Sequence, residues 1–214
     1  MSEAPKSFED VKAFFDKKIN DHGPVPAGLD CRDDAAVTVR YDQILKVVDR
    51  ISGFSIMDYG CGYGGLAPYM DGKGFSDFHY IGRDFSSAMI ENAIRENSAS
   101  GRKFEVGVAD QLPLVDYTVA SGVFNIKLDT SFDEWEQYTL SVLQKLYDAS
   151  TCGIAANFLT GYSDADRKRP DLFYPSPERM FTFGKSLSRN VALLHDYEIY
   201  DFTLVIRRPL APQS

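Results

Sequence analysis

Residues 56–65, with the sequence Ile-Met-Asp-Tyr-Gly-Cys-Gly-Tyr-Gly-Gly, constrain the fold of this chain more than any other stretch. A short apolar run ends in Asp58, and glycines then alternate before a segment of helical character that starts near Tyr63. Glycine adopts positive φ angles without strain and lets a ligand approach the backbone closely. The stretch therefore predicts a buried strand, a tight turn and the N-terminus of a helix.

Two nucleotide-binding patterns fit the same glycines. Gly60-x-Gly62-x-x-Gly65 matches the fingerprint of dinucleotide-binding proteins. Asp58-x-Gly60-x-Gly62-x-Gly64 resembles the first motif of the class I S-adenosylmethionine-dependent methyltransferases. A glycine-rich turn without a ligand is a third alternative. Motifs elsewhere in the sequence are needed to distinguish the three.

Apolar runs and amphipathic stretches alternate along most of the remaining chain. Strands are expected at residues 55–59, 78–82, 104–108, 117–124 and 153–159, with helices at 63–70 and 86–97, a long one from 131, and one from 176 to about 189. Two further β-rich runs, 191–195 and 202–206, are too close together for a parallel crossover, so they must form an antiparallel hairpin. The pattern predicts an α/β fold with one doubly wound, mostly parallel seven-stranded sheet that ends in this C-terminal hairpin.

Two helices are expected before the first strand. Residues 7–21 begin with a capping sequence, Ser-Phe-Glu-Asp, and carry apolar residues at helical spacing. Glycines and prolines in residues 23–28 interrupt the helix. A second helix from Asp33 places six apolar residues on one face, namely Val37, Tyr41, Ile44, Leu45, Val48 and Ile51. We interpret residues 1–52 as a helical extension or lid on a core of residues 53–214, within one domain overall.

Composition and charge exclude several classes of partner. The 214 residues carry a formal net charge of −8, which argues against binding to a nucleic-acid backbone. The one basic run, residues 167–169, is interpreted as a solvated loop because acids flank it. The three cysteines and three histidines are dispersed, so no metal site is expected. Without a signal peptide or a long apolar stretch, the chain is expected to be cytoplasmic and not a membrane partner.

The chemistry is expected at the carboxyl ends of the parallel strands, where ligands bind in such sheets. Asp84 follows Gly62 at close to the roughly 20-residue offset at which an acid accepts hydrogen bonds from both ribose hydroxyls. The structural alternative for Asp84 is a cap for the helix that starts near Ser86. Further strand ends carry Asp110 and Asn125.

Four ordered segments now extend the resemblance to the class I methyltransferases. The first is the glycine motif, and the others are residues 81–86 with Met89 and Ile90, residues 108–113, and residues 117–124. Together they cover about residues 55–207. Two features depart from the family pattern. Arg83 stands where a small or apolar residue is common, and residues 124–127 are not a nucleic-acid methyltransferase signature.

The resemblance implies S-adenosylmethionine as cofactor and S-adenosylhomocysteine as product. It places Asp110 at the adenine amino group, with a strand-ending cap as the structural alternative. Arg40 is a candidate for the cofactor carboxylate or an acidic acceptor, or else an ordinary surface arginine. The full set of expected cofactor contacts is Asp58, Gly60, Cys61, Gly62, Asp84, Phe85, Met89, Asp110, Gln111, Leu112, Ser121, Gly122 and Arg40.

An NAD-dependent oxidoreductase is the weaker alternative. Asp58 lies inside the loop motif, where an acid would repel a pyrophosphate but attract the sulfonium and ammonium groups of S-adenosylmethionine. No Tyr-x-x-x-Lys sequence follows the fourth or fifth expected strand. A protein that binds S-adenosylmethionine as a regulator, without catalysis, remains the other alternative.

The acceptor is expected to be a small molecule, with a hydroxyl group of a metabolite or a sugar favoured. His195 ends the last parallel run and is the candidate general base, since its ordinary pKa lies nearest neutrality. A hairpin histidine bonded to a backbone carbonyl is the structural alternative. Asn125 is the second catalytic candidate and would hold the acceptor oxygen. Tyr162, Phe173 and Tyr174 follow the fifth strand and are candidates for the wall of the acceptor pocket. The sequence does not fix the number of subunits.

Overall fold

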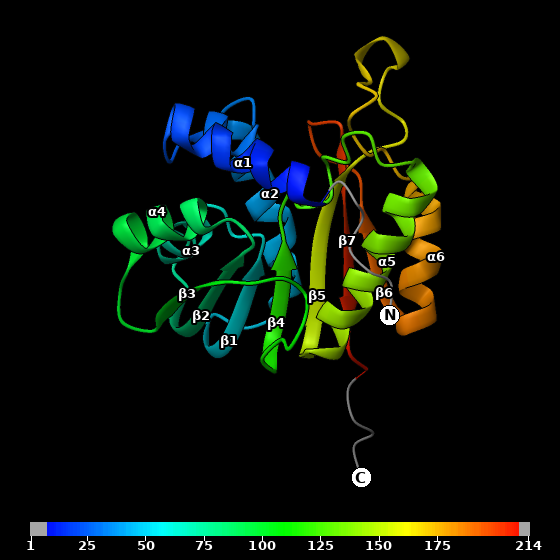
Figure 1. Cartoon of the computed structure of the whole chain (residues 1–214). Helices are drawn as coiled ribbons and strands as arrows, with labels where there is room; N and C mark the ends of the chain where they lie inside the picture. The colour runs from blue at the N-terminus through cyan, green and yellow to red at the C-terminus, as the bar shows by residue number, and fades with distance from the viewer. Residues whose placement is uncertain (1–7, 210–214) are drawn as a thin grey trace.

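Seven strands form one sheet in the computed structural model, which describes residues 8–209 (Figure 1). The strand order is β3-β2-β1-β4-β5-β7-β6, and every neighbouring pair is parallel except β5–β7 and β6–β7. The bounds are β1 Ser52–Tyr59, β2 Ser76–Asp84, β3 Arg102–Val106, β4 Val115–Ala120, β5 Ser150–Leu159, β6 Asn190–Leu194 and β7 Asp201–Arg207. The predicted mostly parallel sheet and its terminal antiparallel hairpin are confirmed.

Six α-helices and three short 3₁₀ helices accompany the sheet within the described residues. They are α1 Phe8–His22, η1 Pro26–Leu29, α2 Asp34–Ile44, η2 Leu45–Val47, α3 Leu66–Gly72, α4 Ser87–Asn97, α5 Phe132–Asp148, η3 Ala165–Arg167 and α6 Pro177–Leu187. Between residues 8 and 209, no helix is long and apolar enough to cross a membrane. The predicted N-terminal helical extension is present, although its predicted first residue, Ser7, lies outside the described part of the chain.

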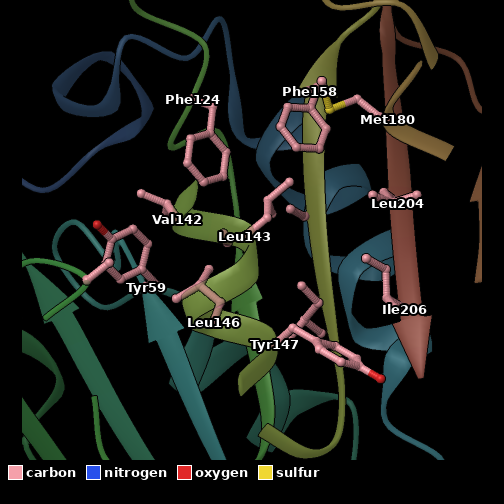
Figure 2. Packing of buried hydrophobic residues seen from close by; sticks show 14 of the residues in the cluster. Tyr59, Phe124, Val142, Leu143, Leu146, Tyr147, Phe158, Met180, Leu204 and Ile206 are labelled. Atoms are coloured by element: carbon pink, nitrogen blue, oxygen red, sulfur yellow. The ribbon is translucent and has the colours of Figure 1, made fainter. Parts of the chain in front are cut away.

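Two buried clusters cover opposite faces of the sheet. In the first, Leu143 and Leu146 of α5 belong to the same buried cluster as Phe158 of β5 and Ile206 of β7 (Figure 2). The second joins α2, η2 and α3 to the other face of β1, β4 and β5. Burying one such large apolar side chain contributes about 1.5–3 kcal/mol. The central strands are therefore apolar on both sides, as expected for parallel strands covered by helices.

Side-chain caps fix the starts of four helices. Asp33 accepts a hydrogen bond from the backbone N–H of Ala36 at 2.8 Å, and Ser131 accepts one from Glu134 at 3.3 Å. Ser86 and Ser176 cap α4 and α6 in the same way. These caps satisfy N–H groups that have no partner inside the helix. The helix starts that the sequence predicts at residues 131 and 176 are confirmed.

Several expected boundaries are wrong by a few residues. The second helix does not continue to Ile51, because the backbone of Val48 adopts an extended conformation. Ile51 is 56% exposed. The helix expected from Tyr63 begins only at Leu66, since glycines with positive φ occupy the turn before it.

The fourth strand is also shorter than expected. It ends at Ala120, so residues 121–124 form a turn instead of continuing the strand. Gly122 has φ of 70°, and its backbone N–H donates to the side-chain oxygen of Asn157 at 2.7 Å. The turn opens the carboxyl end of β4, where α1 crosses above the sheet in Figure 1.

Candidate functional site

The glycine turn after β1 adopts the conformation that the sequence predicts. Gly60, Gly62 and Gly64 have φ angles of 73°, 53° and 79°. Gly65, in contrast, is right-handed with φ of −65°. A Cβ atom on Gly60 would lie 2.4 Å from a methyl group of Val123, so a side chain is excluded there by packing as well. The positive φ angles thus occur at the three glycines of the methyltransferase pattern. Gly65, the third glycine of the dinucleotide pattern, does not need to be a glycine for its φ angle.

A pocket with about 1040 Å³ of empty volume, part of it open to solvent, lies beyond the carboxyl ends of β1, β2 and β4. Ten of the thirteen expected cofactor residues line it: Arg40, Asp58, Gly60, Cys61, Gly62, Asp84, Phe85, Met89, Ser121 and Gly122. The structure thus brings together residues from four separate segments of the chain, namely residue 40 and residues 58–62, 84–89 and 121–122.

Asp84 joins the glycine turn to the start of α4. One carboxylate oxygen accepts the backbone N–H of Gly62 at 2.9 Å, and the other accepts the N–H of Ser86 at 2.9 Å. Burial raises the pKa of Asp84 to about 6, and the two N–H groups oppose this rise. Because Ser86 is the cap of α4, the carboxylate of Asp84 is not needed for that purpose.

Asp58 is a second buried carboxylate at the same pocket. It is 2% exposed and accepts a hydrogen bond from the hydroxyl group of Tyr80 at 2.6 Å. Burial raises the pKa of Asp58 to about 7; the hydrogen bond from Tyr80 opposes the rise and the negative charge of Asp84 adds to it. Within residues 8–209, neither Asp58 nor Asp84 forms an ion pair.

This charge pattern fits S-adenosylmethionine. A buried carboxylate without a counter-ion is unfavourable, and a bound cation removes the cost. S-Adenosylmethionine carries a sulfonium and an ammonium group, so Asp58, Asp84 and the glycine turn would hold it. A pyrophosphate would meet two like charges here, which disfavours a dinucleotide.

Arg40 lines the pocket but its charge is already paired. Its Nε and Nη2 atoms lie 2.7 and 3.4 Å from the carboxylate oxygens of Asp201, and its Nη1 lies 3.1 Å from the Cys31 sulfur. The side chains of Arg40 and Asp201 are 13% and 2% exposed. Arg40 is therefore not an ordinary surface arginine, and it ties α2 to β7. Its contact with a cofactor or acceptor carboxylate stays a prediction.

The structure does not bring Asp110, Gln111 or Leu112 to the pocket. They line a separate groove beside α5, and the side chain of Asp110 is 69% exposed. A carboxylate oxygen of Asp110 lies 2.7 Å from the ammonium of Lys145. Asp110 does not line the pocket, and its expected contact with the adenine amino group stays a prediction.

Residues that the sequence did not predict for a site also line the pocket. Seven of them are apolar: Phe15, Leu29, Val37, Val123, Ile126, Leu159 and Leu172. Leu29 lies over Gly62 and Val123 lies against Gly60, so part of this apolar lining borders the glycine turn. Asp30, which follows η1, pairs with Lys18 at 2.7 Å and lies 3.7 Å from Arg169 in the loop after β5. These contacts join segments far apart in sequence, so no local pattern could have revealed them.

The two expected catalytic residues lie in different places. Asn125 lines the pocket, and its side-chain oxygen accepts the backbone N–H of Leu159 at 3.3 Å. His195 is exposed at the end of β6, with its ring centroid 6.0 Å from those of Tyr162 and Phe202, and it does not line the pocket. Strand β6 lies three steps from β4, or roughly 14 Å at the usual strand spacing.

The expected aromatic wall is not at the pocket either. Phe173 is fully buried against Phe132, with ring centroids 5.0 Å apart. Tyr162 is 65% exposed, and the hydroxyl group of Tyr174 accepts the backbone N–H of Arg169. The loop after β5 contributes Arg169 and Leu172 instead.

Comparisons with known sequences agree with the glycine motif. A family model described as a methyltransferase domain matches residues 56–148. The chain is 39% identical over 165 residues to "Putative methyltransferase Rv1506c" of Mycobacterium tuberculosis. The matched part is 77% of this chain and 99% of that protein.

Comparisons with solved structures agree with the fold. Human N-acetylserotonin methyltransferase in complex with S-adenosylmethionine matches 81% of this chain with a TM-score of 0.59 and 18% identity. The chain spans only 54% of that enzyme. An S-adenosylmethionine-dependent methyltransferase from Aquifex aeolicus matches 82% of this chain and 93% of its own, with a TM-score of 0.58 and 16% identity.

Proposed function

The chain belongs to the class I S-adenosylmethionine-dependent methyltransferases, and we propose that it methylates a small molecule, with a hydroxyl group of a metabolite or a sugar as the acceptor. One observation carries this proposal. The pocket is covered by η1 and by the loop after β5, which meet at Asp30 and Arg169. A pocket enclosed in this way suits a molecule of metabolite size better than a polymer.

When bound, S-adenosylmethionine supplies a methyl group on a positively charged sulfur. The residues of this chain contribute binding, orientation and the exclusion of water. Asp58 and Asp84 provide the negative charge, and the apolar side chains of Phe15 and Leu29 cover the site. Holding the reactants in line in a dry pocket can supply much of the rate of such a displacement.

Asn125 is our candidate for positioning the acceptor. Its side-chain oxygen accepts the backbone N–H of Leu159, and its backbone carbonyl accepts the N–H of Phe173 at 2.8 Å. Two hydrogen bonds therefore fix the position of the residue. The amide NH₂ group remains to donate a hydrogen bond to an acceptor oxygen. His195 would reach the same oxygen only for an acceptor that extends across β5 and β7 to the sheet edge.

The charges near the acceptor end favour a small molecule over a nucleic acid. Arg40 is paired with Asp201, and Arg169 lies against Asp171 and Asp30. Among the described residues that line the pocket, Arg40 and Arg169 are the only cations, and both are paired. Together with the net charge of −8, this pairing disfavours a phosphate backbone as the acceptor. The same pairing leaves the acceptor end open to an uncharged group such as a hydroxyl.

The test is transfer of label from methyl-labelled S-adenosylmethionine to a fractionated cell extract. We expect label in the small-molecule fraction, and less transfer with an Asp84→Asn variant at the same low cofactor concentration. Label confined to the macromolecular fraction would overturn the proposed acceptor class. Binding of S-adenosylhomocysteine without any transfer would instead indicate a regulator.

A further inference from the structure

We propose that Arg83 is a positioning residue that holds the loop after β3 against the glycine turn and thereby shapes the nucleoside end of the cofactor site. Arg83 departs from the family pattern, and nothing in the proposed acceptor chemistry uses it. The inference concerns cofactor binding alone and stands whether or not the acceptor is a small molecule.

The backbone of Arg83 fixes the glycine turn. It lies near the end of β2, between Tyr59 of β1 and Glu105 of β3 in the sheet register. Its carbonyl oxygen accepts the backbone N–H of Gly60 at 2.7 Å and that of Cys61 at 3.1 Å. The next residue, Asp84, holds Gly62, so two consecutive residues of β2 set the path of the turn.

The side chain of Arg83 reaches in the other direction, to residues 107–110. Its Nη1 donates to the carbonyl oxygens of Val108 at 3.2 Å and Asp110 at 3.1 Å, and its Nη2 pairs with Glu105 at 3.0 Å. The side chain is 13% exposed. Only the planar, forked guanidinium can serve three such partners at once, whereas a lysine ammonium acts as a single point charge.

Gly107 makes room for this guanidinium. A Cβ atom on Gly107 would lie 2.7 Å from Nε and 3.0 Å from Cζ of Arg83. The N–H of Gly107 donates to the carbonyl oxygen of Asp84 at 2.9 Å, so the loop is bonded to both residues at the end of β2. Among residues 8–209, the buried Nε of Arg83 has no hydrogen-bond partner, so one donor of the guanidinium is unsatisfied.

The loop of residues 107–112, which the Arg83 side chain holds, borders the cofactor site. Gly107 lines a small cavity together with Gly60, Asp84, Phe85 and others, next to the main pocket. Asp84 has the place of the acid that binds ribose hydroxyls, so the loop beside it lies at the nucleoside end. Loss of the guanidinium frees residues 107–112 and loosens the wall of this cavity.

Arg102 offers a matched control. It is also a largely buried arginine, with a side chain 10% exposed, that donates to a backbone carbonyl, that of Asn97 at 3.1 Å, and pairs with an acid, Asp71. It lies at the other end of the sheet, at the start of β3. Arg102→Met removes comparable contacts away from the site.

The experiment measures the Kd of S-adenosylhomocysteine and of 5′-methylthioadenosine by titration calorimetry, with amide hydrogen exchange of the ligand-free protein. For Arg83→Met we expect both Kd values to rise about 5–20-fold and residues 107–112 to exchange faster, with Arg83→Lys intermediate. Arg102→Met should lower the melting temperature without changing either Kd.

Equal Kd values for Arg83→Met and wild type would overturn the inference, as would unchanged exchange in the loop. A loss for S-adenosylhomocysteine but not for methylthioadenosine would place the effect at the amino-acid end and also overturn it. If Arg83→Met does not fold, the Kd values and exchange rates of Arg83→Lys are compared with those of wild type instead. A wild-type protein that binds neither compound would contradict the assignment of S-adenosylmethionine as the cofactor.

Discussion

The carboxylate of Asp84 accepts the backbone N–H of Gly62 at 2.9 Å, although the two residues lie 22 positions apart. This bond links the two motifs that define the cofactor end of the pocket. A single carboxylate therefore both shapes the glycine turn and presents its charge to the ligand. The relationship explains why the acid and the glycines have to occur together.

Replacing Asp84 by Asn should weaken S-adenosylhomocysteine binding at least tenfold. The change removes the charge from an acceptor whose hydrogen bonds contribute roughly 1.5–3 kcal/mol each. Titration calorimetry measures the effect. Asp116→Asn is the control, because Asp116 accepts the N–H of Ser55 at 2.8 Å near the amino end of β4, far from the pocket. Unchanged affinity in a folded Asp84→Asn variant would remove Asp84 from the site.

The binding of S-adenosylmethionine should release protons near neutral pH. The pKa values of Asp58 and Asp84 are raised to about 7 and about 6 without ligand, and a bound cation lowers both. Affinity should therefore rise from pH 5 to pH 8 and level off above it. Calorimetry at pH 6.5 in two buffers of different ionisation enthalpy measures the released protons. Asp58→Asn should reduce the release, and an equal release in this variant would contradict the assignment.

The same raised pKa values predict how the ligand-free protein responds to pH. In the unfolded chain an aspartate titrates near 3.9, so between about pH 4 and pH 7 the folded state binds more protons at Asp58 and Asp84. Their contribution to the free energy of unfolding is therefore greatest at low pH and falls as pH rises through that window. Thermal melts of wild type and Asp58→Asn should diverge with increasing pH, with the variant gaining relative stability. A constant difference across the window would refute this.

Much of the fold could be predicted because it depends on local signals. The apolar runs of the parallel strands, the caps at Ser131 and Ser176, and the short link before β7 each act within a few residues. The spacing of Asp58, Gly60 and Gly62 similarly reports a backbone requirement that the observed φ angles meet. These features need no knowledge of the tertiary structure.

The parts that were missed depend on contacts between distant segments. Asp110 follows β3 as the sequence indicates, but Lys145 of α5 and the guanidinium of Arg83 set its direction. Asp30 and Arg169 meet above the pocket only after the N-terminal helices and the loop after β5 are in place. His195 ends a parallel strand as expected, but the insertion of β7 beside β5 carries that strand to the sheet edge.

The N-terminal segment should be protected from proteases by the cofactor product. Phe15 and Leu29 line the pocket, and the glycines and prolines at residues 23–28 connect their elements. A bound ligand that contacts both side chains should hold α1 and η1 in place, so cleavage within residues 23–28 should slow with S-adenosylhomocysteine. Limited proteolysis with mass spectrometry measures the rate. The Asp84→Asn variant should show no protection at the same ligand concentration, and equal rates for wild type with and without ligand would contradict the predicted cover.

The acceptor contact can be assigned by comparing Asn125→Ala with His195→Ala, using the acceptor found by label transfer. Asn125 lines the pocket, so its loss should lower turnover about 10–100-fold while the Kd of S-adenosylhomocysteine stays within twofold. His195 is exposed at the sheet edge, and on that placement the variant should keep more than a third of wild-type turnover.

The opposite result has an equally definite meaning, because general-base catalysis contributes about 10²–10⁴-fold. A loss of that size in His195→Ala, with cofactor affinity retained and a pH–rate profile that loses its acidic limb, would identify His195 as the base. The acceptor would then have to span from Asn125 across β5 and β7 to β6. A loss in neither variant would mean that positioning by the apolar wall, with the proton released to solvent, is sufficient for transfer.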